Sequence, residues 1–312
     1  MKVINIDGPI TKKLTDGKVI LALGFFDGVH IGHQKLIGVA RDIANKKKLP
    51  LMVMTFDRHP KEVYAGERDF GYLDTPIEKA EEMDNIGVDY LVMIKFTRKF
   101  SHMPPQDFVD NIIIKLQADT VVAGFDYTYG PKDVANMDNL PKFAKDRFDI
   151  KVVPKQSFEG KKIGSTEIRD AIKNGNLILA NELLNHPYIT SGKVVHGLQN
   201  GHKLGFPTAN LKMDWPKVVP KIGVYATRTR VGDAWYDSMT SVGYNVMFNQ
   251  EKRVYIESNI FDFDKDIYDQ NITIAWYKYT RDEMKFKDLD GLILQLKDDE
   301  TRIRKYLSTL PK

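Results

Sequence analysis

The chain has 312 residues, 42% of them hydrophobic and 28% charged, and its formal net charge is +4 at pH 7. This length suffices for two domains with substantial cores, and the absence of cysteine excludes disulfides, thiol catalysis and cysteine-ligated zinc. The basic residues are interspersed with 42 acidic ones, which argues against a nucleic-acid footprint. No secretory signal or membrane-length apolar run is visible, so we expect a cytoplasmic protein and leave a homo-oligomer open.

The first half of the chain alternates apolar, strand-like segments with amphipathic, helix-like ones. Such alternation predicts a parallel sheet with helices on both faces, which is a doubly wound α/β domain. Its ligands are expected beyond the carboxyl ends of the strands. The expected segments are an edge strand at the beginning of 1–14, strands at 19–24, 50–60, 88–96 and 119–125, and helices at 33–48, 75–87 (capped by Thr75) and 104–117.

The stretch GFFDGVHIGHQKL at 24–36 joins the second of these strands to a helix. A strand-to-helix turn gathers unpaired N–H groups and the positive end of the helix macrodipole, which suits a polyphosphate. Gly24, Gly28 and Gly32 would let the backbone approach such a ligand closely. The turn is therefore our first candidate for a nucleotide site.

His30 and His33 are three residues apart, so they should face the same way on the first turn of the helix. Two imidazoles there can donate hydrogen bonds to phosphate oxygens and stabilise charge that develops as phosphorus is attacked. The alternatives are a pair of surface histidines, or a metal pair that lacks its other ligands.

Two further segments carry candidate binding residues. AGFDYTYG at 123–130 places Asp126 at a strand end and Tyr127 where it can contact a flat ring, although the acid could cap a turn and the tyrosine could be core. GST at 164–166 resembles a helix N-cap, in which Ser165 or Thr166 offers a hydroxyl and Arg169 projects one turn on toward phosphates. A plain helix cap with a surface arginine is the alternative.

After His186-Pro187 the chain consists of short β-rich segments separated by turns, and we expect an antiparallel barrel over 188–280. The amphipathic segment 289–307 should pack on it as a closing helix. We therefore place a domain boundary between 1–186 and 187–312. No internal repeat or low-complexity linker is present.

The barrel contains the stretch GLQNGHKLGFPTANL at 197–211, whose glycines could wrap phosphates. Thr208 and Asn210 alternate onto one side of an extended segment, and their hard oxygens suit Mg²⁺. On residue types alone, a hairpin loop with a polar strand end fits this stretch better. Glu257 lies on an expected strand, where a carboxylate is most often solvent-facing.

Several motifs together resemble one family over nearly the whole chain. GFFDGVHIGH at 24–33 contains the H-x-G-H signature of nucleotidyltransferases and resembles the first motif of the bacterial bifunctional riboflavin kinase/FMN adenylyltransferases, or FAD synthetases. TFDRHP, AGFDYTYG and the segment around 163–169 resemble later blocks of the same domain. LGFPTANL and VYIESNIFDF resemble the riboflavin kinase motifs.

The resemblance implies a Rossmann-like adenylyltransferase domain followed by a kinase barrel. It implies that ATP and riboflavin give FMN, that ATP and FMN give FAD and pyrophosphate, and that Mg²⁺ takes part. His30 and His33 would be catalytic in the first domain, Glu257 would be the general base in the second, and Thr208 and Asn210 would hold the metal. The implied nucleotide- and flavin-binding residues are Gly24, Phe25, Asp27, Gly28, Gly32, Asp126, Tyr127, Ser165, Thr166, Arg169, Gly201, His202, Lys203, Gly205 and Arg281.

The chain departs from the kinase pattern at three places. His202 and Lys203 stand where the family has one Arg or Lys, and Asp269 stands where it has Gly. SVGYNVMF at 241–248 replaces N-x-G-x-R-P-T-F, so it lacks the Asn, Arg, Pro and Thr. Two alternatives follow: an FMN adenylyltransferase with a weakened or inactive kinase barrel, and a non-catalytic flavin-responsive regulatory protein.

Overall fold

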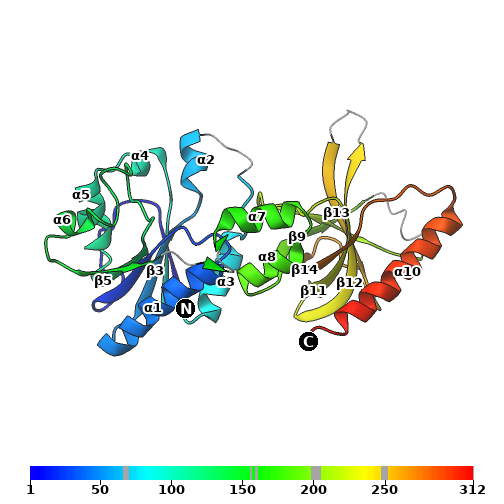
Figure 1. Ribbon diagram of the computed structural model, residues 1–312, viewed down its shortest axis with the longest axis horizontal. Helices are drawn as coiled ribbons and strands as arrows, with labels where there is room; N and C mark the ends of the chain where they lie inside the picture. Colours follow the sequence, from blue (N-terminus) through cyan, green and yellow to red (C-terminus); the bar gives the residue numbers. More distant parts are fainter. Residues whose placement is uncertain (66–69, 155–156, 159–160, 198–204, 247–251, 312) are drawn as a thin grey trace. The chain divides into compact units, whose positions relative to one another are not determined.

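The computed structural model divides into two compact units, Met1–Ser165 and Thr166–Lys312, which are described separately here (Figure 1). None of the described helices is long and apolar enough to cross a membrane. The structure describes residues 1–65, 70–154, 157–158, 161–197, 205–246 and 252–311.

The first unit is built on a six-stranded sheet in the order β1-β4-β3-β2-β5-β6, in which every neighbouring pair is parallel. β1 lies at one edge, as expected from the sequence. β2 and β3 are buried on both faces because helices cover both sides of the sheet. The strands are β1 (Lys2–Ile6), β2 (Val19–Leu23), β3 (Leu51–Phe56), β4 (Tyr90–Ile94), β5 (Ala118–Gly124) and β6 (Asp149–Val153).

Alternate residues of these strands enter two separate cores. On one face, Ile20 and Val53 pack with α1 (Ile31–Lys47) and α3 (Pro76–Asn85). On the other, Leu21 and Met54 pack with α5 (Pro105–Phe108), the π-helical turn η1 (Val109–Ile113) and α6 (Leu140–Ala144). The predicted doubly wound α/β architecture is thus confirmed. The remaining short elements of this unit are α2 (Pro60–Ala65), α4 (Arg98–Ser101), β7 (Ser157–Phe158) and β8 (Lys161–Lys162).

The structure confirms the predicted start of one helix and divides another predicted helix in two. Thr75 caps α3 through a capping box with Glu78, as its place before the helix indicated. The single helix predicted over 104–117 is instead α5 followed by η1, where the N–H of Ile114 bonds to the carbonyl of Val109 five residues back. Such π-turns are not visible in hydrophobic periodicity.

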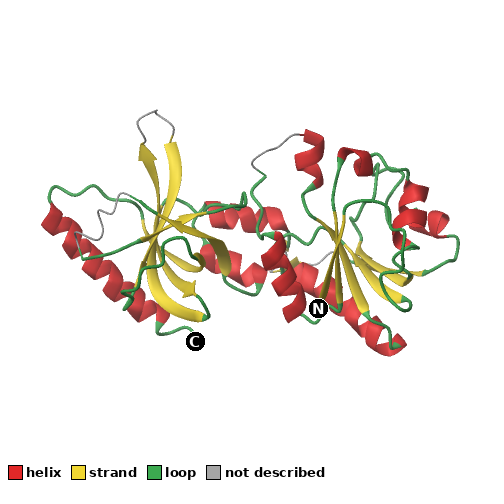
Figure 2. Ribbon diagram, turned by 180° about the vertical axis from the view of Figure 1, so that it is seen from behind, coloured by secondary structure: helices red, strands yellow, loops and turns green. Residues whose placement is uncertain are grey.

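The second unit contains a closed barrel in the order β10-β13-β12-β11-β14-β9, with antiparallel pairing throughout. The predicted barrel and closing helix are confirmed, and Figure 2 shows the C-terminal helix lying beside the strands of the barrel. Ile303 and Leu307 of this helix, α10 (Leu289–Leu307), pack with residues of β11 and β12. The other elements are α7 (Ser165–Lys173), α8 (Leu177–Leu184), β9 (Tyr188–Val195), β10 (Ala209–Lys212), β11 (Gly223–Val231), β12 (Ala234–Val246), β13 (Lys252–Ile260) and β14 (Asn271–Arg281).

Candidate functional sites

The turn between β2 and α1 is tightly constrained. Phe26 and Val29 adopt positive φ values of 53° and 38°, and Gly28 has φ 79°. Positive φ is uncommon for any residue with a side chain, and for a β-branched residue it is strained. Such strain persists only when the surroundings fix the backbone, and it clusters at functional sites.

The two histidines meet as their spacing predicted. Their rings stack with centroids 3.5 Å apart and planes inclined by 16°. His30 is the N-cap of α1, and its Nδ1 accepts the N–H of His33 at 3.3 Å. In the neutral form the His30 proton is therefore on Nε2.

The Nδ1 atom of His33 is buried and has no hydrogen-bond partner among the described residues. Burial, followed by the nearby charges of His30 and Lys79, holds the pKa of His33 well below its ordinary value. His33 is therefore neutral at pH 7. A neutral imidazole with an unmet polar atom fits a site that receives a polar ligand.

Side chains from three other segments hold the turn. The carbonyl of Phe25 accepts hydrogen bonds from Thr55 Oγ1 at 2.7 Å and Lys79 Nζ at 2.9 Å. The N–H of Gly28 donates to Asp74 Oδ2 at 2.8 Å, so this amide is directed at a carboxylate and not at a nucleotide. Asp27 is equally internal, because its Oδ1 accepts the N–H of Leu73 at 3.1 Å.

Gly24 and Gly32 lie close to aromatic side chains of the turn. A Cβ on Gly24 would come within 2.7 Å of the Phe26 ring, and one on Gly32 within 3.1 Å of the His30 ring. Phe25 itself packs edge-on against His59, with ring centroids 4.7 Å apart. These residues therefore shape the turn around the histidine pair.

The segment after β5 provides aromatic side chains, while Asp126 itself is exposed. Tyr127 and Tyr129 pack against the core, and their hydroxyls are buried without a hydrogen-bond partner among the described residues. Burial raises the pKa of both, that of Tyr129 to about 12. Tyr129 also stacks on Phe108, which supports, for this residue, the alternative that the tyrosines belong to the core.

The predicted N-cap at 164–166 is corrected by the structure. α7 begins at Ser165, so Ser165 and Thr166 lie inside the first turn and do not precede it. Ser165 Oγ donates to the carbonyl of Asp27 at 3.0 Å, which ties this segment to the histidine turn. Arg169 lies on α7 in the second unit, and its contact with phosphates stays a prediction.

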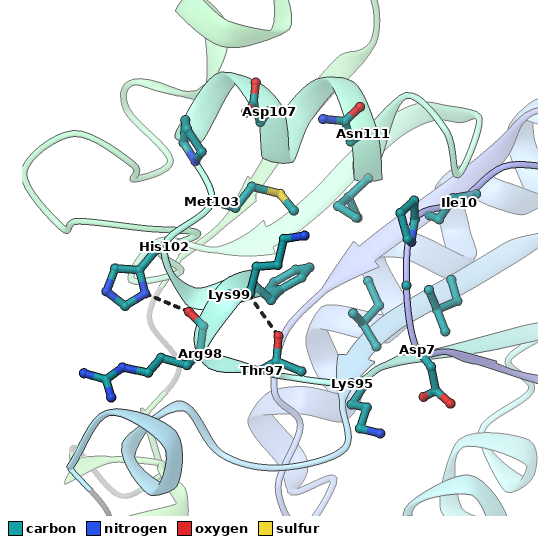
Figure 3. A pocket seen from close by; sticks show the side chains of 17 residues that line it. Asp7, Ile10, Lys95, Thr97, Arg98, Lys99, His102, Met103, Asp107 and Asn111 are labelled. Carbon is teal, nitrogen blue, oxygen red and sulfur yellow. Dashed lines mark hydrogen bonds between the residues drawn. The ribbon is translucent and has the colours of Figure 1, made fainter.

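A cavity of about 1130 Å³ opens beyond the carboxyl ends of β1 and β4 (Figure 3). Its inner wall is apolar, and Met103 and Ile10 reach into it from different segments. The labelled polar side chains around it include Lys95, Arg98 and Lys99, so cations outnumber acids there. The wall is formed by Ile6, Ile10, Ile94, Phe100, Met103 and Ile112.

In the second unit, strand pairing brings three predicted residues together. Asn210 on β10 lies directly opposite Glu257 on β13, and the hydroxyl of Thr208 hydrogen-bonds to the Glu257 carboxyl. Burial raises the pKa of Glu257, and the bond from Thr208 partly opposes that shift. Glu257 is therefore a half-buried carboxyl and not the solvent-facing one that residue type alone favoured.

Gly197 packs against this group. A Cβ at Gly197 would lie 2.4 Å from Nδ2 and 2.6 Å from Oδ1 of Asn210, so only glycine leaves room for the amide. A cavity of about 390 Å³ opens next to Thr208 and is lined by Phe263, Tyr268 and the acids between them. This arrangement offers oxygen ligands beside a pocket.

We expect Gly197→Ala to reduce riboflavin phosphorylation about tenfold or more, because a 1 Å displacement at a reacting site can cost about 10²-fold. The added methyl must displace Asn210 from its place opposite Glu257. Steady-state FMN formation, compared with Gly232→Ala at an open turn, measures the effect. Gly232 has positive φ and Gly197 does not, so the control measures the cost of backbone strain away from the site. A loss in Gly197→Ala no larger than the loss in Gly232→Ala would contradict the role assigned to Asn210.

The departing segment 241–248 lies beside the same carboxylate. Ser241 on β12, which stands where the family has Asn, is paired with Glu257 on β13, and Gly243 is paired with Tyr255. The Tyr255 hydroxyl contacts Glu283, and burial, Glu283 and Glu257 raise its pKa to about 12. Residues 247–248 lie outside the described residues.

Five more residues of the second unit were predicted to bind nucleotide or flavin. Gly201, His202 and Lys203 lie outside the described residues. Gly205 has φ 80° and open space around it. Arg281 forms an ion pair with Asp299 of α10 at 2.7 Å, so part of its guanidinium holds the closing helix. Its contact with nucleotide or flavin stays a prediction.

Sequence reasoning missed Lys79, Asp74 and the cavity after β4. Lys79 and Asp74 resemble surface charges in an amphipathic helix and its approach, and only burial reveals them. The cavity is formed by segments distant in sequence. The signal that could have found it is the apolar and basic run 94–103 after a predicted strand, since ligands bind at such ends.

Comparison with known proteins gives matches to both units. The FAD synthetase family model matches residues 12–167, and the riboflavin kinase family model matches residues 184–307. A bifunctional riboflavin kinase/FMN adenylyltransferase of Listeria monocytogenes is 45% identical over 312 residues, which is 99% of each chain. One of Bacillus subtilis is 39% identical over the full length of both.

Among solved structures, the crystal structure of a macrolide-efflux protein from Streptococcus pneumoniae matches with a TM-score of 0.90 and 36% identity. The match covers 97% of this chain and 99% of that one. The match therefore spans the residues of both units.

Proposed function

Because the chain belongs to the family of bifunctional riboflavin kinases/FMN adenylyltransferases, we propose that its two reactions occur at the two groups of residues described above, one in each unit. The protein phosphorylates riboflavin to FMN with ATP and adenylylates FMN to FAD. The observation that best supports the placement of adenylyl transfer is the stacked pair of histidines on a strained turn. Purified protein supplied with riboflavin, ATP and Mg²⁺ should form both FMN and FAD.

In adenylyl transfer, a phosphate oxygen of FMN attacks the α-phosphorus of ATP, and pyrophosphate leaves. We assign to His30 and His33 the stabilisation of the negative charge that builds on the phosphate oxygens in the transition state. His30 would donate from Nε2, and neutral His33 would donate from one ring nitrogen. Preorganised donors of this kind need no rearrangement during the reaction.

We assign the flavin ring of FMN to the cavity of about 1130 Å³ after β4, because its wall is apolar and its opening is rich in cations. Neighbouring strands lie about 4.8 Å apart, so the ends of β4 and β2, which flank β3, are about 10 Å apart. The extended ribityl phosphate tail of FMN suits such a separation. Tyr127 and Tyr129 would then lie beside the bound flavin or adenine.

Met103→Trp should narrow this cavity where the flavin ring is proposed to bind and raise the KM for FMN in FAD formation about tenfold or more, a loss of ~1.4 kcal/mol in binding. The KM for riboflavin in FMN formation should not change. The matched control is Ile77→Trp, an exposed apolar site on α3 in the same unit. An unchanged KM for FMN in the Met103 variant would place the ring elsewhere.

In the barrel, we assign the general base to Glu257, which would take the proton of the riboflavin 5′-hydroxyl as that oxygen attacks the γ-phosphorus of ATP. Its raised pKa makes it a better base at neutral pH than an exposed carboxylate. ATP would enter the cavity of about 390 Å³ beside Thr208. Alignment and charge stabilisation supply most of such catalysis.

The residues beside Glu257 fit Mg²⁺. Thr208 and Asn210 present hard oxygens near a carboxylate, and Gly197 leaves the room that the Asn210 amide needs. When bound, Mg²⁺ would neutralise charge on the ATP phosphates. Thr208 and Asn210 would hold it there, while Glu257 orients the hydroxyl.

We keep the functional division at 1–186 for adenylylation and 187–312 for the kinase. The family models end at 167 and begin at 184, so α7 and α8 lie largely between the two matches. Small-molecule substrates are the partners proposed for both units. Arg169 and Arg281 remain proposed contacts with phosphate and with nucleotide or flavin.

A further inference from the structure

Lys79 is a buried cation whose position the two reactions do not explain by themselves. Its side chain is only 5% exposed, although it lies on the amphipathic helix α3. Lysine is almost never fully buried unless it is paired. Burying an ammonium group costs several kcal/mol unless good partners compensate. Its partners therefore indicate what it does.

All the described contacts of the Lys79 ammonium are with the histidine turn or with the carboxylate that holds the turn. Its Nζ donates to the carbonyl of Phe25 at 2.9 Å and lies 4.3 Å from the centre of the Phe25 ring. The same Nζ is 3.7 Å from Asp74 Oδ1. The other oxygen of Asp74 accepts the N–H of Gly28. Lys79 thus contacts the first residue of the turn 25–28, and Asp74 contacts the last.

The turn needs these contacts because its backbone conformation is unfavourable. Phe26 and Val29 hold positive φ while their side chains are buried, and such a backbone persists only where its surroundings fix it. The turn leads directly into His30, the N-cap of α1, and a relaxed backbone would move both imidazoles. Correct placement of the histidine pair therefore depends on contacts that oppose relaxation.

We propose that Lys79 is a positioning residue for adenylyl transfer, which uses Asp74 and the Phe25 carbonyl to hold the strained turn so that His30 and His33 face the reacting phosphate. The inference rests on the proposed function of the two histidines. Lys79 itself does not touch the reacting atoms. Its buried positive charge also acts on the electrostatics of the histidine pair.

That electrostatic effect gives a readout that mere structural support would not produce. The Lys79 charge contributes to the lowered pKa of His33, after burial and the charge of His30. Other titratable side chains at the turn, among the described residues, include Asp27, which accepts from Leu73, Asp74, which accepts from Gly28, and His59, whose ring packs on Phe25. Removing a cation from this set raises the pKa of His33 toward its ordinary value.

The test compares Lys79→Met with Thr55→Val, which removes the other side-chain hydrogen bond to the Phe25 carbonyl without changing charge. We expect Lys79→Met to lower kcat for FAD formation roughly 10- to 100-fold, with a KM for FMN that changes little. The acidic limb of its pH profile should move to higher pH. Thr55→Val should lower kcat without moving that limb, and the exposed-residue control Lys115→Met should do neither.

Two further variants separate the possible failures. Lys79→Arg keeps the charge and should retain most of the wild-type rate and the wild-type acidic limb. If Lys79→Arg loses as much as Lys79→Met, or if Lys79→Met leaves kcat and the limb unchanged, the positioning role is wrong. His33→Ala measured in parallel tests the underlying proposal, because a normal rate in that variant would refute the histidine site itself.

Discussion

Replacing either His30 or His33 with alanine is expected to slow FAD formation from FMN by roughly 10²- to 10³-fold, because each removes one preorganised donor to the reacting phosphate. FMN formation from riboflavin should stay at the wild-type rate, since that reaction is proposed to occur in the barrel. Separate assays with riboflavin or FMN as the flavin substrate, at saturating MgATP, measure the two steps.

The loss should appear mainly in kcat, because the flavin ring is proposed to bind in the cavity after β4 and not at the histidines. Lys115→Met, at an exposed position of the same unit, serves as the control. Should either histidine variant lose both reactions while its thermal melt stays cooperative, the assignment of one reaction to each unit would be refuted.

Glu257→Gln is expected to lower kcat for FMN formation about 10²- to 10⁴-fold, the usual cost of a lost general base. Glutamine keeps the size of the side chain and can still contact Thr208, so the apparent affinity for ATP should change little. Burial raises the pKa of Glu257, and the wild-type rate should therefore fall as the pH drops through that raised value. The variant should lack this acidic limb.

FAD formation from supplied FMN should be normal in Glu257→Gln, and Glu182→Gln at an exposed position of α8 should leave both reactions normal. This measurement also separates two readings of the barrel. Ser241 lies opposite Glu257 in place of the family's Asn. A working kinase with weak apparent affinity for riboflavin would therefore be explained by the departing segment 241–248. If Glu257→Gln forms FMN at the wild-type rate, the barrel uses another mechanism.

The parts of the account that sequence predicted are local or periodic. Alternating apolar segments predicted the doubly wound sheet, and regular short strands predicted the barrel. The spacing of His30 and His33 predicted that they share a side of the first turn, and their rings stack. Thr208, Asn210 and Glu257 were connected only through the resemblance, and strand register then placed them together.

The parts that sequence did not predict depend on contacts between distant segments. The bonds from the Leu73 N–H to Asp27 Oδ1 and from the Gly28 N–H to Asp74 were not expected from the sequence, and contact of Asp27 and Gly28 with nucleotide stays a prediction. Lys79 looked like an ordinary solvent-facing residue of α3, because a helical pattern does not show which neighbouring segment covers it. The π-turn η1 was also not predicted, because the spacing of its apolar residues looks like that of an ordinary α-helix that continues α5.

The central claim, one reaction in each unit, is tested most directly by mixing two variants. The His30→Ala/His33→Ala protein should convert riboflavin to FMN and stop there, whereas Glu257→Gln should make FAD only from supplied FMN. When the two are mixed with riboflavin and MgATP, chromatography of the flavins should show FAD. Loss of both reactions in either folded variant, or a mixture that accumulates FMN without FAD, would contradict the account.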